Sequence, residues 1–109
     1  MAMCEIAWTS FKSPAKIFKK RIVGADDVRI HPTQKPVTLY EWQLQLFAKD
    51  GDLILDTHLG SGSIALAVEK ANRLDKANLT FVGIEIDKEY YCNAIKRIEE
   101  YCKQGTIMF

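Results

Sequence analysis

The residues best suited to chemistry lie at the end of a short apolar run. This run begins at Leu53, ends on Asp56 and is followed by a glycine-rich loop. Residues 60–65 read Gly-Ser-Gly-Ser-Ile-Ala, which matches the G-x-G-x-x-G/A pattern of dinucleotide-binding turns. Glu85 ends the next apolar run, 20 residues beyond Ala65, which is the spacing of a carboxylate that binds ribose hydroxyls. The alternative is a tight strand-to-helix turn followed by a solvated glutamate.

Asp56 discriminates among the nucleotide-like ligands. A carboxylate at the end of the same strand would repel a pyrophosphate over the loop, at a cost on the order of several kcal/mol when partly desolvated. S-adenosylmethionine would instead be attracted by Asp56, because it carries an ammonium and a sulfonium. Its ribose also suits Glu85. Its carboxylate needs a donor, for which Lys35 is a candidate, although Lys35 can equally be a surface lysine. Charge therefore favours S-adenosylmethionine over NAD, and an NAD-binding oxidoreductase fragment is the remote alternative.

Hydrophobic periodicity predicts the elements that would position these groups. Helices are expected over residues 37–49, 62–76 and 88–102, and strands over residues 52–57 and 79–86. This alternation of helices and strands implies parallel strands joined by right-handed crossovers. The tail from Gly105 is expected to be a short strand or irregular.

The chain before residue 24 reads as a β-hairpin. Residues 4–11 and 15–23 are rich in β-branched and aromatic side chains and are separated by a Lys-Ser-Pro turn. The first 35 residues carry seven lysines and arginines against three acids, although the net charge of all 109 residues is only +1. That basic third would suit a phosphate backbone, or it is a solvated strand face.

Composition excludes several classes of protein. Cys4, Cys92 and Cys102 are odd in number and scattered, which fits reduced thiols better than a disulfide framework or a zinc site. The sequence has no apolar run of the roughly 18 residues that span a membrane, and no secretory signal pattern. We therefore expect a cytoplasmic protein without a metal or a membrane partner.

Three motifs in a fixed order carry a family resemblance. They are HPTQKP at residues 31–36, DTHLGSGS at residues 56–63 and FVGIEID at residues 81–87. The chain resembles the C-terminal half of the DNA amino-methyltransferases, the N6-adenine and N4-cytosine enzymes, in their circularly permuted order. The resemblance implies a partial, Rossmann-like α/β fold that uses S-adenosylmethionine. Its mostly parallel sheet would have flanking helices and an N-terminal hairpin, in a single truncated domain with the hairpin at residues 4–23 and the cofactor-binding part at residues 31–104.

The resemblance also assigns a cofactor site and no metal. The HPTQKP motif would surround the methionine end of the cofactor, the glycine loop would bind the cofactor, and Glu85 would bind the ribose. His58 stands where the family usually has an aromatic residue, and it has no partner for a metal because His31 belongs to another motif. The implied cofactor-binding residues are Thr33, Gln34, Lys35, Pro36, Asp56, His58, Gly60, Ser61, Gly62 and Glu85.

The catalytic loop of this family is absent from the sequence. In the family, an Asp/Asn-Pro-Pro-Tyr/Phe loop receives the flipped base, whereas the prolines here are Pro14, Pro32 and Pro36. We therefore expect a DNA methyltransferase fragment that is inactive alone and has no catalytic residue; the alternative is a non-catalytic module that binds S-adenosylmethionine or a partner. Strands without their neighbours leave open edges, which predicts a homo-oligomer.

Overall fold

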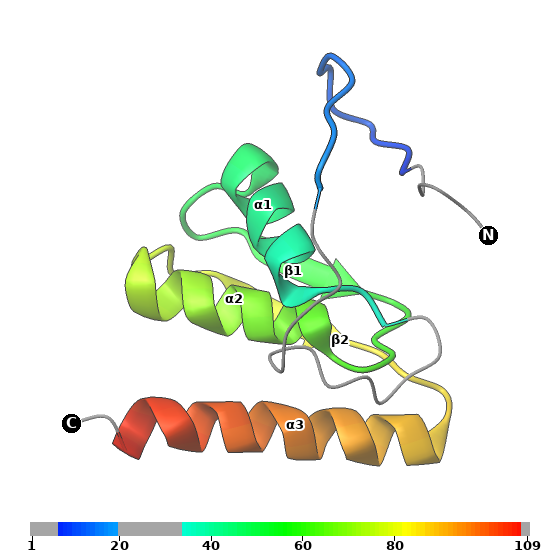
Figure 1. Cartoon of the computed structure of the whole chain (residues 1–109), viewed down its shortest axis with the longest axis vertical. Coiled ribbons are helices and arrows are strands. Elements are labelled where there is room, and N and C mark those ends of the chain that lie inside the picture. Colours follow the sequence, from blue (N-terminus) through cyan, green and yellow to red (C-terminus); the bar gives the residue numbers. More distant parts are fainter. Residues whose placement is uncertain (1–6, 20–33, 108–109) are drawn as a thin grey trace.

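The computed structural model describes residues 7–19 and 34–107. Helices and strands alternate along the second of these ranges, in the order that periodicity predicts (Figure 1). The elements are α1 (Val37–Phe47), β1 (Leu53–Asp56), α2 (Ser63–Leu74), β2 (Thr80–Gly83) and α3 (Lys88–Ile107). The α/β class is therefore confirmed. Within the described residues, no helix is long and apolar enough to cross a membrane.

The two strands form a parallel pair, with α2 as the crossover between them. The register aligns Asp56 with Gly83, and the pairing extends past both strand ends. The Ile84 N–H donates to the Asp56 carbonyl and the Leu59 N–H donates to the Ile84 carbonyl, both at 2.8 Å. The glycine loop and Glu85 thus leave the sheet at the same edge, as parallel strands require.

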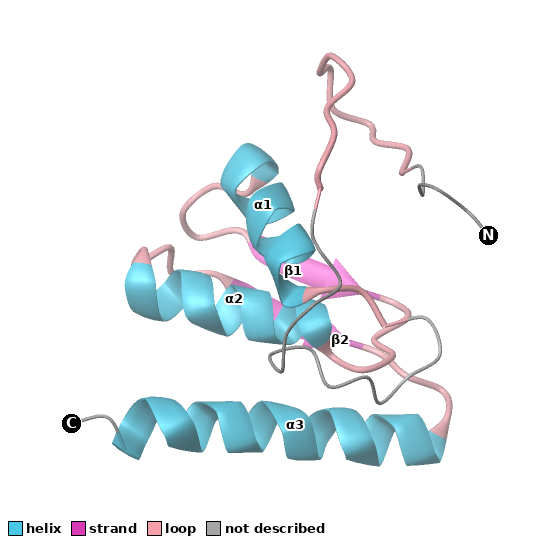
Figure 2. Cartoon of the chain, viewed as in Figure 1, coloured by secondary structure: helices cyan, strands magenta, loops and turns pink. Residues whose placement is uncertain are grey.

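The hydrophobic core lies on one face of the sheet, where the strands lie behind α1 and α2 in Figure 2. Ile54 and Phe81, which are neighbours in the register, pack against a buried cluster to which all three helices contribute. The buried members of this core are Leu44, Leu59, Ile64, Ala67, Val68, Leu79 and Ala94. Alternation along the strands sends Ile54 and Phe81 inward and their chain neighbours to the opposite face.

The opposite face of the sheet carries apolar side chains in contact with solvent. Leu53, Leu55, Val82 and Ile84 are 65%, 59%, 45% and 52% exposed, respectively. We call these four residues the open face. Parallel sheets are almost always covered on both faces, so within residues 7–19 and 34–107 the open face lacks a layer that such a sheet normally has.

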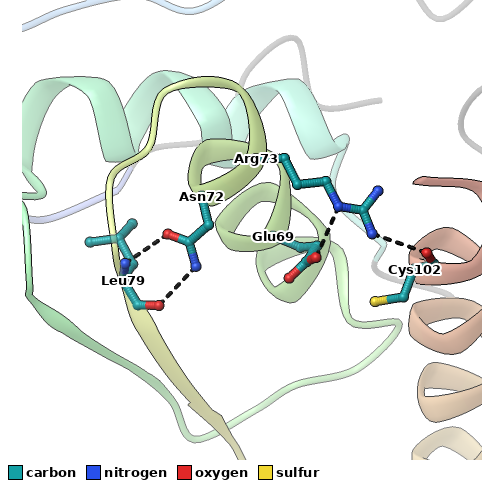
Figure 3. Close-up of polar contacts among 5 residues, drawn as sticks. All are labelled: Glu69, Asn72, Arg73, Leu79 and Cys102. Carbon is teal, nitrogen blue, oxygen red and sulfur yellow. Dashed lines mark hydrogen bonds and ion pairs between the residues drawn. The ribbon is translucent and has the colours of Figure 1, made fainter. Parts of the chain in front are cut away.

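The C-terminal end of α2 is tied to both of its neighbours (Figure 3). The side-chain oxygen of Asn72 accepts the Leu79 N–H at 2.7 Å, and its nitrogen donates to the Leu79 carbonyl at 2.9 Å. Arg73 donates to Glu69 at 3.0 Å and to the Cys102 carbonyl of α3 at 3.2 Å. Asn72 therefore holds the start of β2, and Arg73 links α2 to α3.

The predicted N-terminal hairpin is wrong over its described part. Residues 7–19 contain no strand, while residues 4–6 and 20–23 lie outside the described residues. Two aromatic rings of this segment contact α1 instead: the Phe11 and Phe47 ring centroids are 4.6 Å apart, and those of Phe18 and Trp42 are 5.4 Å apart. An isolated two-stranded hairpin is marginally stable, so stacking on a helix is the alternative open to these rings.

The prediction for the tail also differs from the structure. Residues expected to be a strand or irregular continue α3 as far as Ile107. Lys103 and Gln104, which are good helix formers, carry the helix beyond Cys102.

Candidate cofactor site

The glycine loop between β1 and α2 requires glycine at two positions. Gly60 and Gly62 have φ angles of 58° and 84°, in the left-handed region that other L residues rarely adopt. A Cβ atom on Gly62 would also lie 3.3 Å from Cδ1 of Ile98 on α3. The loop thus turns tightly and passes close to α3.

The Glu85 carboxylate fixes this loop from the end of β2. One oxygen accepts the Gly60 N–H at 2.8 Å and the other accepts the Asp87 N–H at 3.0 Å. Asp87 in turn accepts the Tyr90 N–H at 3.0 Å, as a helix N-cap does. Each carboxylate oxygen can accept more than one hydrogen bond, so these two bonds do not by themselves prevent Glu85 from accepting another from a hydroxyl group.

Asp56 participates in the same turn through its side chain. Its Oδ1 accepts the His58 N–H at 2.9 Å, which closes the first part of the loop. The Nδ1 atom of His58 lies 2.9 Å from the Thr57 hydroxyl, and the His58 side chain is exposed. Asp56 therefore shapes the loop and adds a negative charge at its start.

A cavity of about 340 Å³ lies beside the glycine loop, within the size range of small-molecule sites. Its lining comes from three separate parts of the chain: the start of α1, the glycine loop, and the turn from β2 into α3. The lining residues are Gln34, Lys35, Tyr40, His58, Leu59, Gly60, Ser61, Ser63, Glu85, Asp87 and Tyr90.

The cavity gathers most of the residues that the sequence assigns to a cofactor site. The predicted residues that line it are Gln34, Lys35, His58, Gly60, Ser61 and Glu85. Pro36, Asp56 and Gly62 are not among the lining residues, although each lies within two positions of one along the chain. Thr33 lies outside the described residues.

Sequence reasoning missed five lining residues: Tyr40, Leu59, Ser63, Asp87 and Tyr90. Two of them carried a usable signal. Asp87 directly precedes the helix expected from residue 88 and is a favoured N-cap residue, and a residue at the start of this helix, two positions after Glu85, lies at the same edge of the sheet. Tyr40 lies one helical turn after Pro36, so its ring is near the HPTQKP motif by helix spacing alone.

The charges of the cavity favour a cationic ligand over a pyrophosphate. Glu85 and Asp87 contribute two carboxylates, whereas Lys35 contributes one ammonium. The Tyr40 and Tyr90 rings add flat apolar surface with hydroxyl groups. A ligand with a cation, hydroxyls, a planar ring and one anionic group fits this set of side chains, and S-adenosylmethionine has all of these. Among the described residues, no cluster of three His, Cys, Asp or Glu side chains is placed to hold a metal ion.

A larger cavity, of about 520 Å³, lies at the amino ends of the strands, away from the glycine loop. Its walls include Leu44, Ala71 and Leu79, together with an ion pair of 2.8 Å between Lys70 and Glu41. None of the three sequence motifs contributes a lining residue to this cavity, which distinguishes it from the cavity at the glycine loop.

Comparisons with known proteins identify the family of the chain. A family model described as a DNA methylase, for N6 and N4 methyltransferases, matches residues 4–97. The type II methyltransferase M.HpaI of Haemophilus parainfluenzae is 38% identical over 69 residues, which are 63% of this chain and 20% of that protein. The type II methyltransferase M2.DpnII of Streptococcus pneumoniae is 41% identical over 69 residues, 63% of this chain and 24% of that protein.

Among solved structures, the crystal structure of the M1.HpyAVI–SAM complex superposes with a TM-score of 0.59 at 34% identity, covering 73% of this chain and 36% of that chain. The chain thus spans about a fifth to a quarter of the length of the curated relatives, between 20% and 24%. Because the family model extends over most of the sequence, the chain belongs to the N6/N4 DNA methylase family.

Proposed function

We propose that the chain is the cofactor-binding part of a DNA methyltransferase and that the glycine-loop cavity binds S-adenosylmethionine. The observation that carries this proposal is the meeting of three sequence motifs on one cavity of about 340 Å³. The M1.HpyAVI structure, which contains SAM, supports the choice of cofactor.

The side chains of the cavity suggest how the cofactor would be held. Glu85 would accept hydrogen bonds from the ribose hydroxyls, and Lys35 would bind the carboxylate of the methionine end. Asp87 adds negative charge that favours a cationic ligand. Gln34, together with Thr33 and Pro36 of the same motif, would surround the methionine end. The bound cofactor would supply the methyl group that such enzymes transfer.

The acceptor of that methyl group is proposed from the family alone. DNA would be methylated at the exocyclic amine of adenine or cytosine, in the cytoplasm. This chain contains no Pro-Pro sequence, so the loop that receives the base would have to be supplied elsewhere. We therefore infer that the chain alone does not catalyse methyl transfer. A non-catalytic module that binds S-adenosylmethionine or a partner is the second candidate, supported by the same missing loop.

Self-association is proposed from the open face. Four apolar side chains on one side of a two-stranded sheet are exposed by 45% to 65%, and burying them is favourable by about 25 cal/mol per Å². A second copy of the chain offers the same apolar surface, so two open faces can cover each other in a symmetric dimer.

Calorimetric titration tests the proposed ligand. We expect the chain to bind S-adenosylmethionine and not NAD, and Glu85→Ala to weaken that binding by at least tenfold. Glu100→Ala, an exposed glutamate on α3, serves as the control and leaves binding unchanged. Equal affinity for NAD, or an unaffected Glu85→Ala variant, would reject the site.

A methyl-transfer assay on unmethylated DNA separates the two candidate functions. The fragment hypothesis predicts no transfer by the chain alone and transfer when the remaining portion of a related methyltransferase is added. A chain that binds S-adenosylmethionine but never supports transfer would instead be a non-catalytic module.

A further inference from the structure

Arg97, on the part of α3 that faces the glycine loop, is a residue that the sequence motifs leave unassigned. Its Nη1 group lies 3.1 Å from the Ser61 carbonyl oxygen, 3.0 Å from the Ser63 hydroxyl and 3.4 Å from the Ser61 hydroxyl. Both serines are nearly buried, with 5% and 3% exposed. One guanidinium therefore contacts three oxygens across the turn that holds Gly62.

The polarity of these contacts fixes the direction of the serine hydroxyls. A guanidinium only donates hydrogen bonds, so neither serine can direct its hydroxyl hydrogen at Arg97. The two hydroxyl oxygens lie 3.3 Å apart, which uses one of the two hydrogens. The second hydrogen is left for an acceptor elsewhere, and both serines line the cavity. A ligand in the cavity can be this acceptor.

We propose that Arg97 is a positioning residue that fixes the Ser61-Gly62-Ser63 turn and makes the serine pair a donor toward a carboxylate of the bound ligand. A carboxylate is the strongest acceptor for such a donor, and Lys35 lines the same cavity and adds positive charge. The identity of the ligand rests on the proposed function, whereas the claim that Arg97 fixes the turn does not.

The test compares ligands with and without a carboxylate. S-adenosylmethionine and decarboxylated S-adenosylmethionine are titrated calorimetrically into the wild-type chain and into Arg97→Met, Arg97→Lys and Lys96→Met. Lys96→Met is the matched control, because Lys96 is an exposed cation beside Arg97 on the same helix.

We expect the wild type and Lys96→Met to prefer the carboxylated ligand by about 10- to 100-fold, the range of a hydrogen bond to a charged group. Arg97→Met should lose most of this preference, and Arg97→Lys should retain part of it because an ammonium can still donate to the serine oxygens. If Arg97→Met weakened both ligands equally, the role would be merely structural and the proposal would be overturned. Ser63→Ala, which removes one hydroxyl and leaves α2 intact, should reduce the preference in the same way.

Amide hydrogen exchange provides a measurement that needs no ligand. Arg97→Met should raise the exchange rates of residues 61–63 severalfold, while Lys96→Met leaves them unchanged. Unchanged rates in Arg97→Met would refute the hold on the turn. A wild-type chain that bound neither ligand would refute the proposed cofactor and the carboxylate role together, and the exchange rates would still decide whether Arg97 fixes the turn.

Discussion

Gly60 and Glu85 are 25 positions apart in the chain, and the Gly60 N–H donates to Oε1 of Glu85 at 2.8 Å. The residue expected to bind a ribose therefore also fixes the backbone of the loop on which a cofactor would lie. Since the second oxygen of Glu85 accepts the Asp87 N–H, one carboxylate joins the loop, the end of β2 and the start of α3. The Glu85 carboxylate therefore organises the site through contacts within the protein alone.

Replacing Glu85 by glutamine should destabilise the fold. Glutamine keeps one acceptor oxygen but places an amide group against one of the two backbone N–H groups. We expect a loss of about 1–3 kcal/mol in the free energy of unfolding, as for other hydrogen bonds to a charged group. Urea denaturation measures the change, with Glu99→Gln on the exposed side of α3 as the control. Equal stability of the two variants would show that the carboxylate does not hold the loop.

Gly62→Ala and Gly51→Ala separate backbone strain from packing. Both glycines have strongly positive φ angles, 84° and 86°, so each alanine costs about 1–2 kcal/mol in backbone strain. Only at Gly62 does the new methyl group meet α3, at 3.3 Å from Cδ1 of Ile98, whereas nothing lies within 4 Å at Gly51. Thermal or urea unfolding should therefore show a larger loss for Gly62→Ala, by about 1 kcal/mol or more.

The contact with Ile98 can be tested directly. Ile98→Val removes the Cδ1 atom that the alanine would approach most closely. Added to Gly62→Ala, it should cost less than it does in the wild type. Strict additivity of the two substitutions would contradict close packing of the loop against α3.

Asn72→Ala should weaken the junction between α2 and β2. The change removes two hydrogen bonds, of 2.7 and 2.9 Å. The N–H and carbonyl groups of the buried Leu79 then lose the Asn72 side chain as their partner. We expect a loss of about 1–3 kcal/mol in the free energy of unfolding. Asn93→Ala on the exposed surface of α3 is the control and should stay within about 0.5 kcal/mol of the wild type.

Leu55→Lys should reduce self-association through the open face. Leu55 is 59% exposed at the centre of that face, and a charged side chain there opposes burial against a second copy. Sedimentation at tens of micromolar should show a dimer or larger species for the wild type and a shift toward monomer for the variant. Asn93→Lys adds the same charge on α3 and should leave the distribution unchanged. A monomeric wild type would reject the proposed oligomer.

The order of the elements followed from local periodicity, and most of the cavity followed from motifs. Both are readable from sequence because the apolar spacing of α2 and the strand-loop-helix pattern around Gly60 are contiguous features. The expected strands near Phe11 and Phe18 failed for a different reason. A strand is completed by a neighbouring strand, and composition alone does not say whether that neighbour is present. Among the described residues no such strand is present, and the Phe11 and Phe18 rings contact α1.

Arg97 illustrates a second limit of prediction from sequence. On a helix wheel it is one of several charged positions of α3, between Lys96 and Ile98, and nothing local distinguishes it from a solvated arginine. Its role depends on how α3 docks beside α2, which brings it within 3.0 Å of the Ser63 hydroxyl. The close approach of Ala94 and Ile98 to Gly62 is the related signal, and it too appears only in three dimensions.

Two of the side chains that fix the glycine loop come from later in the chain, Glu85 by 25 positions from Gly60 and Arg97 by 34 from Ser63. During synthesis from the N-terminus, the loop is therefore made before Glu85 and Arg97 have been added to the chain. The contacts with Arg97 can form only after α3 has docked, so the final fixing of the loop belongs among the late, non-local steps of folding. Interruption of synthesis just before residue 97 would yield both strands of the sheet but a loop without its contacts to Arg97.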